Sequence, residues 1–440
     1  MGENRRPVLE KFEEQSAKTN ARVAHDIEAY RKGDAKIAVC SKDGTAVEAE
    51  IKVTQKSHAF KHGANLFMLD DLGSEEKNQA YRKYFADAFN IATLPFYWSA
   101  TEPEKGVMRY AKDSSYMYRR PPVEACMEYC AENGIEPREH ALAYERTFPE
   151  WLYGADSATV KRELERRYAE ISERYAERIL CIEVTNEHEW GLGEGKTAFY
   201  SDPDMIRWSY DMAARYFPNN EIAINEWGNI WGEAYKTRSR YYLMIENALL
   251  KGTRIDAIGM QFHMLYNRED EYNAAARYYD PANLFETMDA YAGLGKPLQI
   301  SEITIPSYSW EKEDEEIQAE IIDKLYHIWF SHPAVEQIIY WNLVDGYACC
   351  AEQGDMSAGQ NYHHGGLLRF DLTPKPAYET IRNLFQKEWH TEEMLRTNGG
   401  NSSFRGFYGK YDVAVTSGGR TVTEEIELKK GGVNEFTVVL

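Results

Sequence analysis

Short apolar runs alternate with longer amphipathic, charged runs between about residue 60 and residue 390. The apolar runs are rich in β-branched residues and have the length of buried strands, whereas the longer runs have the periodicity of helices with one apolar face. The predicted strands occupy residues 59–64, 91–95, 137–142, 180–186, 221–225, 256–263, 298–303 and 337–343. The predicted helices occupy residues 75–89, 123–133, 159–178, 204–217, 235–251, 281–293, 314–331 and 376–386. This repeated strand–helix pattern predicts an α/β fold, a (β/α)8 TIM barrel.

The two ends of the chain show a different pattern, in which short alternating strands are separated by glycine-containing turns. Residues 35–54 predict a hairpin, and residues 404–440 predict three or four further strands. Because an isolated hairpin is only marginally stable, we expect both ends to form one small accessory β-sandwich. The alternative is two independent flaps packed on the barrel. The predicted domains are an N-terminal helical or irregular lead at 1–33, the split sandwich at 34–58 plus 401–440, and the barrel at 59–392.

Charge and composition exclude several classes of partner. The chain has 51 Lys and Arg against 71 Asp and Glu, a net charge of −20, so it would repel a nucleic acid. No apolar run reaches the length of a transmembrane helix, and we expect no membrane partner. The first residues lack a signal-peptide pattern, so we expect a cytoplasmic protein, or a secreted one if the sequence has been trimmed. The six cysteines lack zinc-binding spacing, and we expect neither a metal nor an organic cofactor. The oligomeric state stays open.

Two glutamates stand at the ends of predicted strands. Glu187 ends the fourth strand and Glu302 ends the seventh. Because catalytic residues of such barrels lie at the carboxyl ends of the strands, the two should face each other across the barrel mouth. Paired carboxylates of this kind perform retaining glycoside hydrolysis. A strand-end glutamate can also be merely solvated or salt-bridged, and Glu226, after the fifth strand, is interpreted as a supporting carboxylate.

A set of short motifs extends along the whole barrel in a fixed order. They are Thr101–Gly106, Arg138–Leu142, Val184–Glu187, Ile258–His263, Ile300–Ile305, Tyr340–Trp341 and Pro374–Tyr378. In these motifs the chain resembles glycoside hydrolase family 10, the family of endo-β-1,4-xylanases. The resemblance implies that Glu187 is the acid/base and Glu302 the nucleophile. It also implies that Asn186 donates a hydrogen bond to the 2-hydroxyl of the bound sugar. The residues that line the subsite of this sugar would be His140, Gln261, His263 and Trp341.

The chain departs from the family pattern at two places. After the second strand the family usually has Glu-Asn-x-x-Lys, whereas this chain has Leu94–Trp98, which is shorter and aromatic. A Trp-His pair that follows the third strand in the family is replaced by Tyr144-Glu145. We therefore expect Trp98 and Tyr144 to contact the substrate, or the rings after strand two to fill the volume left by the deletion.

These observations predict a retaining β-glycoside hydrolase, similar to an endo-β-1,4-xylanase, that acts on a plant-type polysaccharide or oligosaccharide by double displacement. The predicted partner is thus a carbohydrate substrate. Two alternatives stay open, a glycosidase of altered sugar specificity and a carbohydrate-binding barrel without catalytic activity.

Overall fold

The structure, a computed structural model, describes residues 5–440 and divides into two compact units. The barrel unit holds the chain up to Gln15, His62–Trp329 and Ala334–Tyr378, and the sandwich unit holds Ser16–Lys61, Phe330–Pro333 and Glu379–Leu440. The sandwich unit therefore begins earlier than the predicted boundary at residue 34. The reason is that the helix α2 (Ser16–Tyr30) is followed within two residues by the first strand of the sandwich.

The barrel unit is a closed ring of parallel strands, which confirms the predicted TIM barrel. The strands follow in the order β11-β3-β4-β5-β6-β7-β8-β10, and the ring closes through β10 and β11. A short strand β9 extends β8 after a one-residue break. Their bounds are β3 Lys61–Asn65, β4 Ile91–Pro95, β5 Glu136–His140, β6 Cys181–Asn186, β7 Glu221–Glu226, β8 Ala257–Met260, β9 Phe262–His263, β10 Leu298–Thr304 and β11 Val335–Tyr340.

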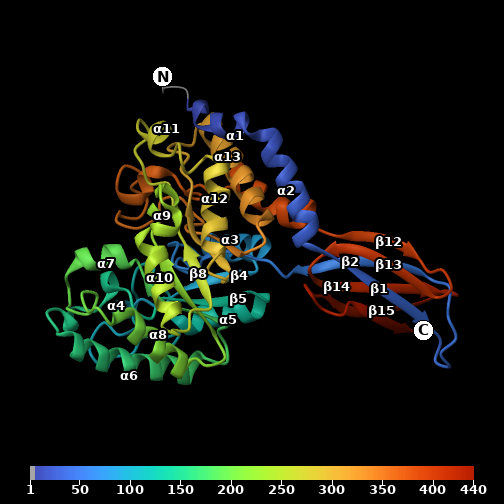
Figure 1. The fold of residues 1–440 in the computed structure, drawn as a ribbon, viewed down its shortest axis with the longest axis horizontal. Coiled ribbons are helices and arrows are strands. Elements are labelled where there is room, and N and C mark those ends of the chain that lie inside the picture. Colours follow the sequence, from blue (N-terminus) through green and yellow to red (C-terminus); the bar gives the residue numbers. More distant parts are fainter. Residues whose placement is uncertain (1–4) are drawn as a thin grey trace. The chain divides into compact units, whose positions relative to one another are not determined.

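Helices follow the barrel strands in sequence and surround the strands (Figure 1). The long ones are α3 Glu75–Ala88, α5 Val123–Asn133, α6 Ser157–Tyr175, α8 Met205–Tyr216, α10 Arg240–Leu250, α12 Pro281–Ala292 and α13 Lys312–Ser331. A further helix, α14 Pro376–Asn383, spans the boundary in sequence between the barrel unit and the sandwich unit. The short ones are α1 Glu10–Glu14, α4 Trp98–Thr101, α7 His188–Glu194, α9 Asn229–Gly232 and α11 Glu271–Ala274. None of the helices formed by residues 5–440 combines the length and the apolar character that a membrane crossing requires.

The sandwich unit unites strands from both ends of the chain, as predicted (Figure 1). One sheet has the order β13-β1-β16 and the other the order β12-β2-β14-β15. The bounds are β1 Lys32–Cys40, β2 Glu50–His58, β12 Glu392–Arg396, β13 Asn401–Phe407, β14 Gly409–Ser417, β15 Arg420–Leu428 and β16 Glu435–Val439. Alternate side chains of both sheets, among them Ile37 and Val413, form one buried core. Two independent flaps are excluded, because β1 pairs with β13 and β2 with β14.

The aromatic segment after β4 corrects one expectation, because Trp98 belongs to the barrel core. Its side chain is 1% exposed and its ring packs edge-on against Phe148 and Trp151. The indole Nε1 donates to Glu102 Oε2 at 2.8 Å, so even its polar atom is used internally. The chain enters the helix α4 at this residue, and successive side chains on a helix point about 100° apart. Trp98 therefore faces away from the neighbour Tyr97, which lies at the barrel mouth.

We predict that Trp98→Ala lowers the thermal unfolding midpoint of the barrel, because the loss of a fully buried indole costs about 3–5 kcal/mol. Calorimetry measures this directly. The matched control is Tyr235→Ala, which removes a ring that is 74% exposed and should change the stability by no more than about 0.5 kcal/mol. A Trp98→Ala protein that melts with the parent would contradict the core assignment.

Candidate active site

Glu187 and Glu302 meet at the carboxyl ends of the barrel strands, joined by one amide. The Nε2 of Gln261 donates to Glu187 Oε1 at 3.2 Å and to Glu302 Oε1 at 3.0 Å. The two carboxylate oxygens can therefore be no farther apart than the sum of these two hydrogen-bond lengths. Glu187 follows β6 with a φ of 50°, in the left-handed region, and this turn directs the chain into α7. Both side chains are almost completely buried.

Three donors surround Glu302. Asn225 Nδ2 and Gln261 Nε2 both donate to Oε1 at 3.0 Å, and His263 Nε2 lies 3.1 Å from Oε2. Burial lowers the pKa of His263 to about 4, so its ring is neutral at physiological pH. Its Nε2 then donates to Glu302, and its Nδ1 accepts from the hydroxyl of Thr304 at 2.9 Å. The arrangement favours a negatively charged Glu302.

The amide of Asn225 is held in one orientation. Ser301 Oγ donates to its Oδ1 at 2.6 Å, which turns Nδ2 toward Glu302 and toward Glu183. The neighbouring strand allows this close contact because Gly259 has no side chain. A Cβ at that position would lie 2.5 Å from Asn225 Oδ1 and 2.9 Å from a backbone carbonyl, so a larger residue would displace the amide.

Glu187 has a different set of neighbours. The hydroxyl of Tyr144 donates to its Oε2 at 2.5 Å. Burial and the charge of Glu187 raise the pKa of Tyr144 well above its usual range, so the phenol stays protonated as a donor. Glu226 lies on the far side and accepts from the backbone N–H of His188 at 2.8 Å. That carboxylate thus fixes the turn that carries Glu187.

Electrostatics distinguish the buried carboxylates of the barrel. Burial raises the pKa of Glu302 well above its usual range, and the charges of Glu183 and Glu187 add to this effect. Burial also raises the pKa of Glu187, against the lowering effect of the hydrogen bonds from Tyr144 and Gln261. Glu183 differs, because the neighbouring His140 and Arg138 outweigh the effect of burial and lower its pKa. A proton in this cluster is therefore held by the pair Glu187 and Glu302 and not by Glu183.

Beneath the pair lies an ion-pair cluster formed by Arg138, Glu183 and His140. Arg138 donates to Glu183 Oε2 at 2.6 Å, and His140 Nδ1 donates to Glu183 Oε1 at 2.8 Å. The potential ligand atoms of His140, Glu183 and Glu302 lie within 4.8 Å of one another, which is close enough to hold a metal ion. Since Arg138 already supplies the positive charge and His140 Nδ1 is used as a donor, these residues fit an ion pair and not a metal site.

Rings line the site next to this cluster. Trp341 lies with its ring centroid 5.3 Å from that of Phe67 and 5.3 Å from that of His140. Tyr97 donates its hydroxyl to His140 Nε2 at 3.2 Å, and its ring packs on Phe67 at 5.6 Å. Tyr97 therefore takes the place at the site that the sequence predicted for Trp98.

The predicted site residues thus fall into two groups. The structure brings together Glu187, Glu302, His140, Tyr144, Asn186, Gln261, His263 and Trp341; Asn186 accepts from Gln261 Nε2 at 3.2 Å. Trp98 stays in the core. Sequence reasoning missed Glu183, Asn225 and Tyr97. The available signal for the first two was a polar residue inside an otherwise apolar strand, which has to be paired when buried.

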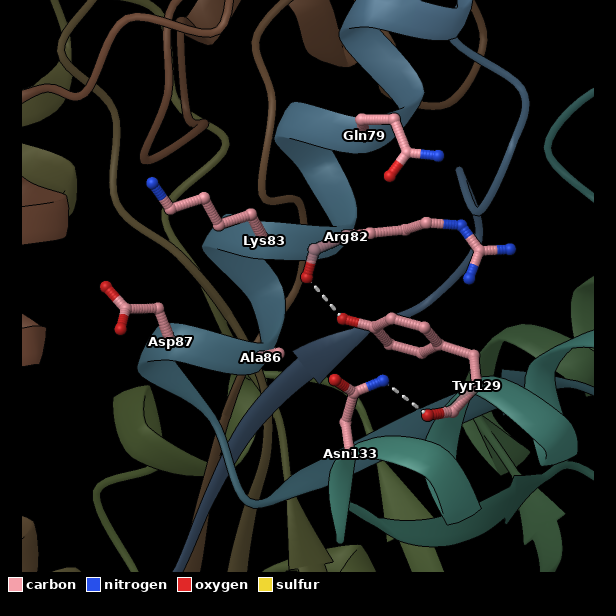
Figure 2. A pocket seen from close by; sticks show the side chains of 7 residues that line it. All are labelled: Gln79, Arg82, Lys83, Ala86, Asp87, Tyr129 and Asn133. Carbon is pink, nitrogen blue, oxygen red and sulfur yellow. Dashed lines mark hydrogen bonds between the residues drawn. The ribbon is translucent and has the colours of Figure 1, made fainter.

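A separate pocket of about 490 Å³ lies on the outside of the barrel between α3 and α5 (Figure 2). Its lining residues are Gln79, Arg82, Lys83, Ala86, Asp87, Tyr129 and Asn133. Tyr129 donates to the backbone carbonyl of Arg82, and Asn133 donates to that of Tyr129 (Figure 2). Asp87 is the single carboxylate among the lining residues, so this pocket cannot perform chemistry that needs two carboxylates.

Comparisons with known proteins show which family the chain resembles. Residues 58–384 match the model of glycosyl hydrolase family 10. The chain is 25% identical over 412 residues to anti-sigma-I factor RsgI6 of Acetivibrio thermocellus, covering 90% of this chain and 46% of that protein. It is also 25% identical over 346 residues to endo-1,4-beta-xylanase B of Thermotoga neapolitana, covering 75% and 88%. Endo-1,4-beta-xylanase B of Cellvibrio japonicus is 24% identical over 293 residues, and this chain spans 42% of its length.

Solved structures share the barrel. Xylanase 10B from Thermotoga petrophila, solved in complex with xylobiose, superposes with a TM-score of 0.58 at 21% identity, covering 75% of this chain and 95% of that one. Native xylanase 10B from Thermotoga maritima gives the same TM-score and identity, with 75% and 96% covered. With the family match extending over most of the barrel and including both strand-end glutamates, the chain belongs to glycosyl hydrolase family 10.

Proposed function

We propose that this protein is a retaining β-glycoside hydrolase that cleaves a β-1,4-xylan-type glycan. The observation that carries the proposal is the pair Glu187 and Glu302, which share the amide of Gln261. Carboxyl groups of retaining enzymes lie about 5–5.5 Å apart, and those of inverting enzymes about 6.5–9.5 Å apart. A pair bridged by one nitrogen fits the shorter spacing, which leaves no room for a water between the second carboxylate and the sugar.

The first step needs a charged nucleophile and a protonated acid. Two buried carboxylates this close repel each other when both are ionised, and this costs free energy. The pair therefore holds one proton. Asn225, Gln261 and His263 all donate toward Glu302, which favours the charge there and the proton on Glu187. Glu302 Oε attacks the anomeric carbon while Glu187 protonates the leaving oxygen, giving a covalent glycosyl-enzyme.

The second step reverses the roles. Glu187, now ionised, takes a proton from water as the water attacks the anomeric carbon and releases Glu302. The nearby Tyr144 stabilises the ionised form of Glu187 through its hydroxyl, and Glu226 holds the turn in place. Both groups act on the geometry and the pKa of Glu187 without transferring a proton themselves.

The surrounding residues support a sugar ligand. The Asn186 Oδ1 accepts from Gln261, which leaves its amide N–H groups available for a sugar 2-hydroxyl beside the nucleophile. Trp341, which packs against Phe67 and His140, offers apolar ring surface of the kind that stacks on sugars. Relatives named endo-1,4-beta-xylanases and a neighbour that holds xylobiose support xylan as the substrate class.

A binding barrel without catalytic activity is disfavoured by the arrangement around Glu302. Burial of a carboxylate is costly unless donors surround it, and this chain keeps three donors at Glu302 as well as a separate hydroxyl at Glu187. A site used only to bind a neutral glycan has no need for two buried acids. Release of a phenol from aryl β-xylosides, β-cellobiosides and β-glucosides separates the sugar specificities.

We predict that Glu302→Ala abolishes turnover and leaves the fold intact, because the covalent route has no other nucleophile. Azide should restore part of the activity and give a glycosyl azide of inverted configuration, measured by NMR. Circular dichroism controls for the fold. Restored turnover with retained configuration would count against this role for Glu302.

We predict that Glu187→Ala slows the cleavage of unactivated oligosaccharides by about 10²–10⁴-fold, while substrates with activated aryl leaving groups lose far less in the glycosylation step. Only the former need protonation of the leaving oxygen. The ratio of kcat/KM on the two substrate types is the measurement. Equal losses on both would indicate a structural role for Glu187, or Glu226 as the acid.

We predict that Tyr144→Phe moves the alkaline limb of the pH profile of kcat/KM to higher pH. The hydroxyl of Tyr144 lowers the pKa of Glu187, so its removal raises that pKa and keeps the general acid protonated to a higher pH. Tyr153→Phe, which alters a ring that is 47% exposed, is the matched control. An alkaline limb that stays in place or moves to lower pH would refute the link between Tyr144 and the acid.

A further inference from the structure

Two adjacent arginines, Arg119 and Arg120, lie at the mouth of the barrel in a protein of net charge −20. They belong to the loop between α4 and α5. The guanidinium carbon of Arg120 lies 4.3 Å from the ring centroid of Tyr97, whose hydroxyl contacts His140. Arg119 donates to Asn342, the residue after Trp341, at 3.2 Å. Arg120 therefore contacts a ring that lines the site directly, and Arg119 contacts the residue that follows Trp341.

Arg119 has no ion-pair partner in the described part of the chain. Its side chain is almost fully buried, and its Nε has no hydrogen-bond acceptor among residues 5–440. The nearby Asp71 does not fill this role, because its carboxylate accepts the backbone N–H of Arg119 at 2.7 Å and the hydroxyl of Tyr116 at 2.9 Å. A buried guanidinium with an unused donor is costly unless an anion completes it.

Arg120 is held by contacts other than carboxylates. It donates to the backbone carbonyl of Arg119 at 2.7 Å and stacks on Phe67 and Tyr97, at 5.1 and 4.3 Å from their centroids. Burial lowers its pKa to about 10, so it remains charged at neutral pH. Within residues 5–440, no carboxylate lies within ion-pair distance of either arginine, while most other arginines of this acidic chain have such a partner.

We propose, on the basis of the glycosidase function above, that Arg119 and Arg120 recognise a carboxylate carried by the substrate, that is, a hexuronic acid substituent on the glycan. A guanidinium donates two parallel N–H groups in a geometry that matches a carboxylate. The rings of Tyr97 and Phe67 exclude water from the pair and strengthen the attraction. If the two arginines served only to balance the negative charge of the buried glutamates, they would contact Glu183 or Glu302, as Arg138 contacts Glu183.

The test compares one glycan in two forms. Oligosaccharides of a glucuronic-acid-substituted β-1,4-xylan are used as isolated, and again after carbodiimide activation and borohydride reduction, which converts each carboxylate into a primary alcohol. The parent protein should cleave the acidic form with a kcat/KM at least about tenfold higher, the gain expected of charge-assisted hydrogen bonds. This preference should fall as salt concentration rises.

Arg120→Gln should remove most of the preference, so that the ratio of kcat/KM for the acidic form to kcat/KM for the reduced form falls toward one. Arg119→Gln tests the second arginine in the same way. If Arg119→Gln does not fold, Arg119→Lys, which keeps the charge, takes its place. The matched control is Arg162→Gln on the outer helix α6, which removes the same charge at an exposed position and should keep the preference. Equal kcat/KM for both forms in the parent protein, or a preference that survives in Arg120→Gln, would overturn the proposal.

Binding separates this proposal from the function on which it rests. Calorimetry with the Glu302→Ala protein measures the affinity for both oligosaccharide forms without turnover. Tighter binding of the acidic form supports carboxylate recognition even if the parent protein cleaves neither form, in which case only the proposed hydrolysis fails. Equal affinities, together with cleavage of both forms by the parent, would leave the hydrolysis intact and reject the role of the arginines.

Discussion

The crowding of three buried glutamates at the barrel mouth is the constraint on which the site depends. Glu183, Glu187 and Glu302 would repel one another strongly in an apolar interior. Each of the three has different hydrogen-bond donors. Arg138 and His140 donate to Glu183, whereas Asn225 and His263 donate to Glu302. Glu187 accepts from the hydroxyl of Tyr144. What remains is one pair of acids whose pKa values are raised by burial. The proposed catalytic roles of Glu187 and Glu302 follow from this difference between their environments.

Support for this arrangement comes from residues that hold the partners of the carboxylate pair in place. Gly259 leaves space for Asn225, Ser301 orients its amide, and Glu226 anchors the backbone after Glu187. Each belongs to a different strand of the barrel, so the geometry of the pair depends on closure of the whole ring. The aromatic side of the mouth, formed by Phe67, Tyr97 and Trp341, shares fewer hydrogen bonds with this network. Arg119 and Arg120, for which residues 5–440 provide no carboxylate within ion-pair distance, lie on that side.

Much of the fold could be predicted from sequence because it depends on repeated local patterns. Eight apolar runs with intervening amphipathic helices indicate a barrel, and turn residues between alternating strands indicate the sandwich. Glu187 and Glu302 could be found because strand ends are where barrels place their chemistry. The burial of Trp98 could not be predicted from sequence. Along a helix, a shift of one residue turns a side chain from the barrel mouth toward the core. Partners such as Asn225 to Glu302 depend on three-dimensional register between strands, which no local pattern records.

The stereochemistry of hydrolysis tests the central claim most directly. Proton NMR during the first minutes of cleavage of a β-1,4-xylo-oligosaccharide identifies the anomer that is released before mutarotation mixes the two forms. A pair of carboxylates bridged by Gln261 predicts double displacement, so the β-anomer should accumulate first and the α-anomer should appear only by mutarotation. Initial release of the α-anomer would require a water between Glu302 and the sugar, and would contradict the assignment of Glu302 as the nucleophile.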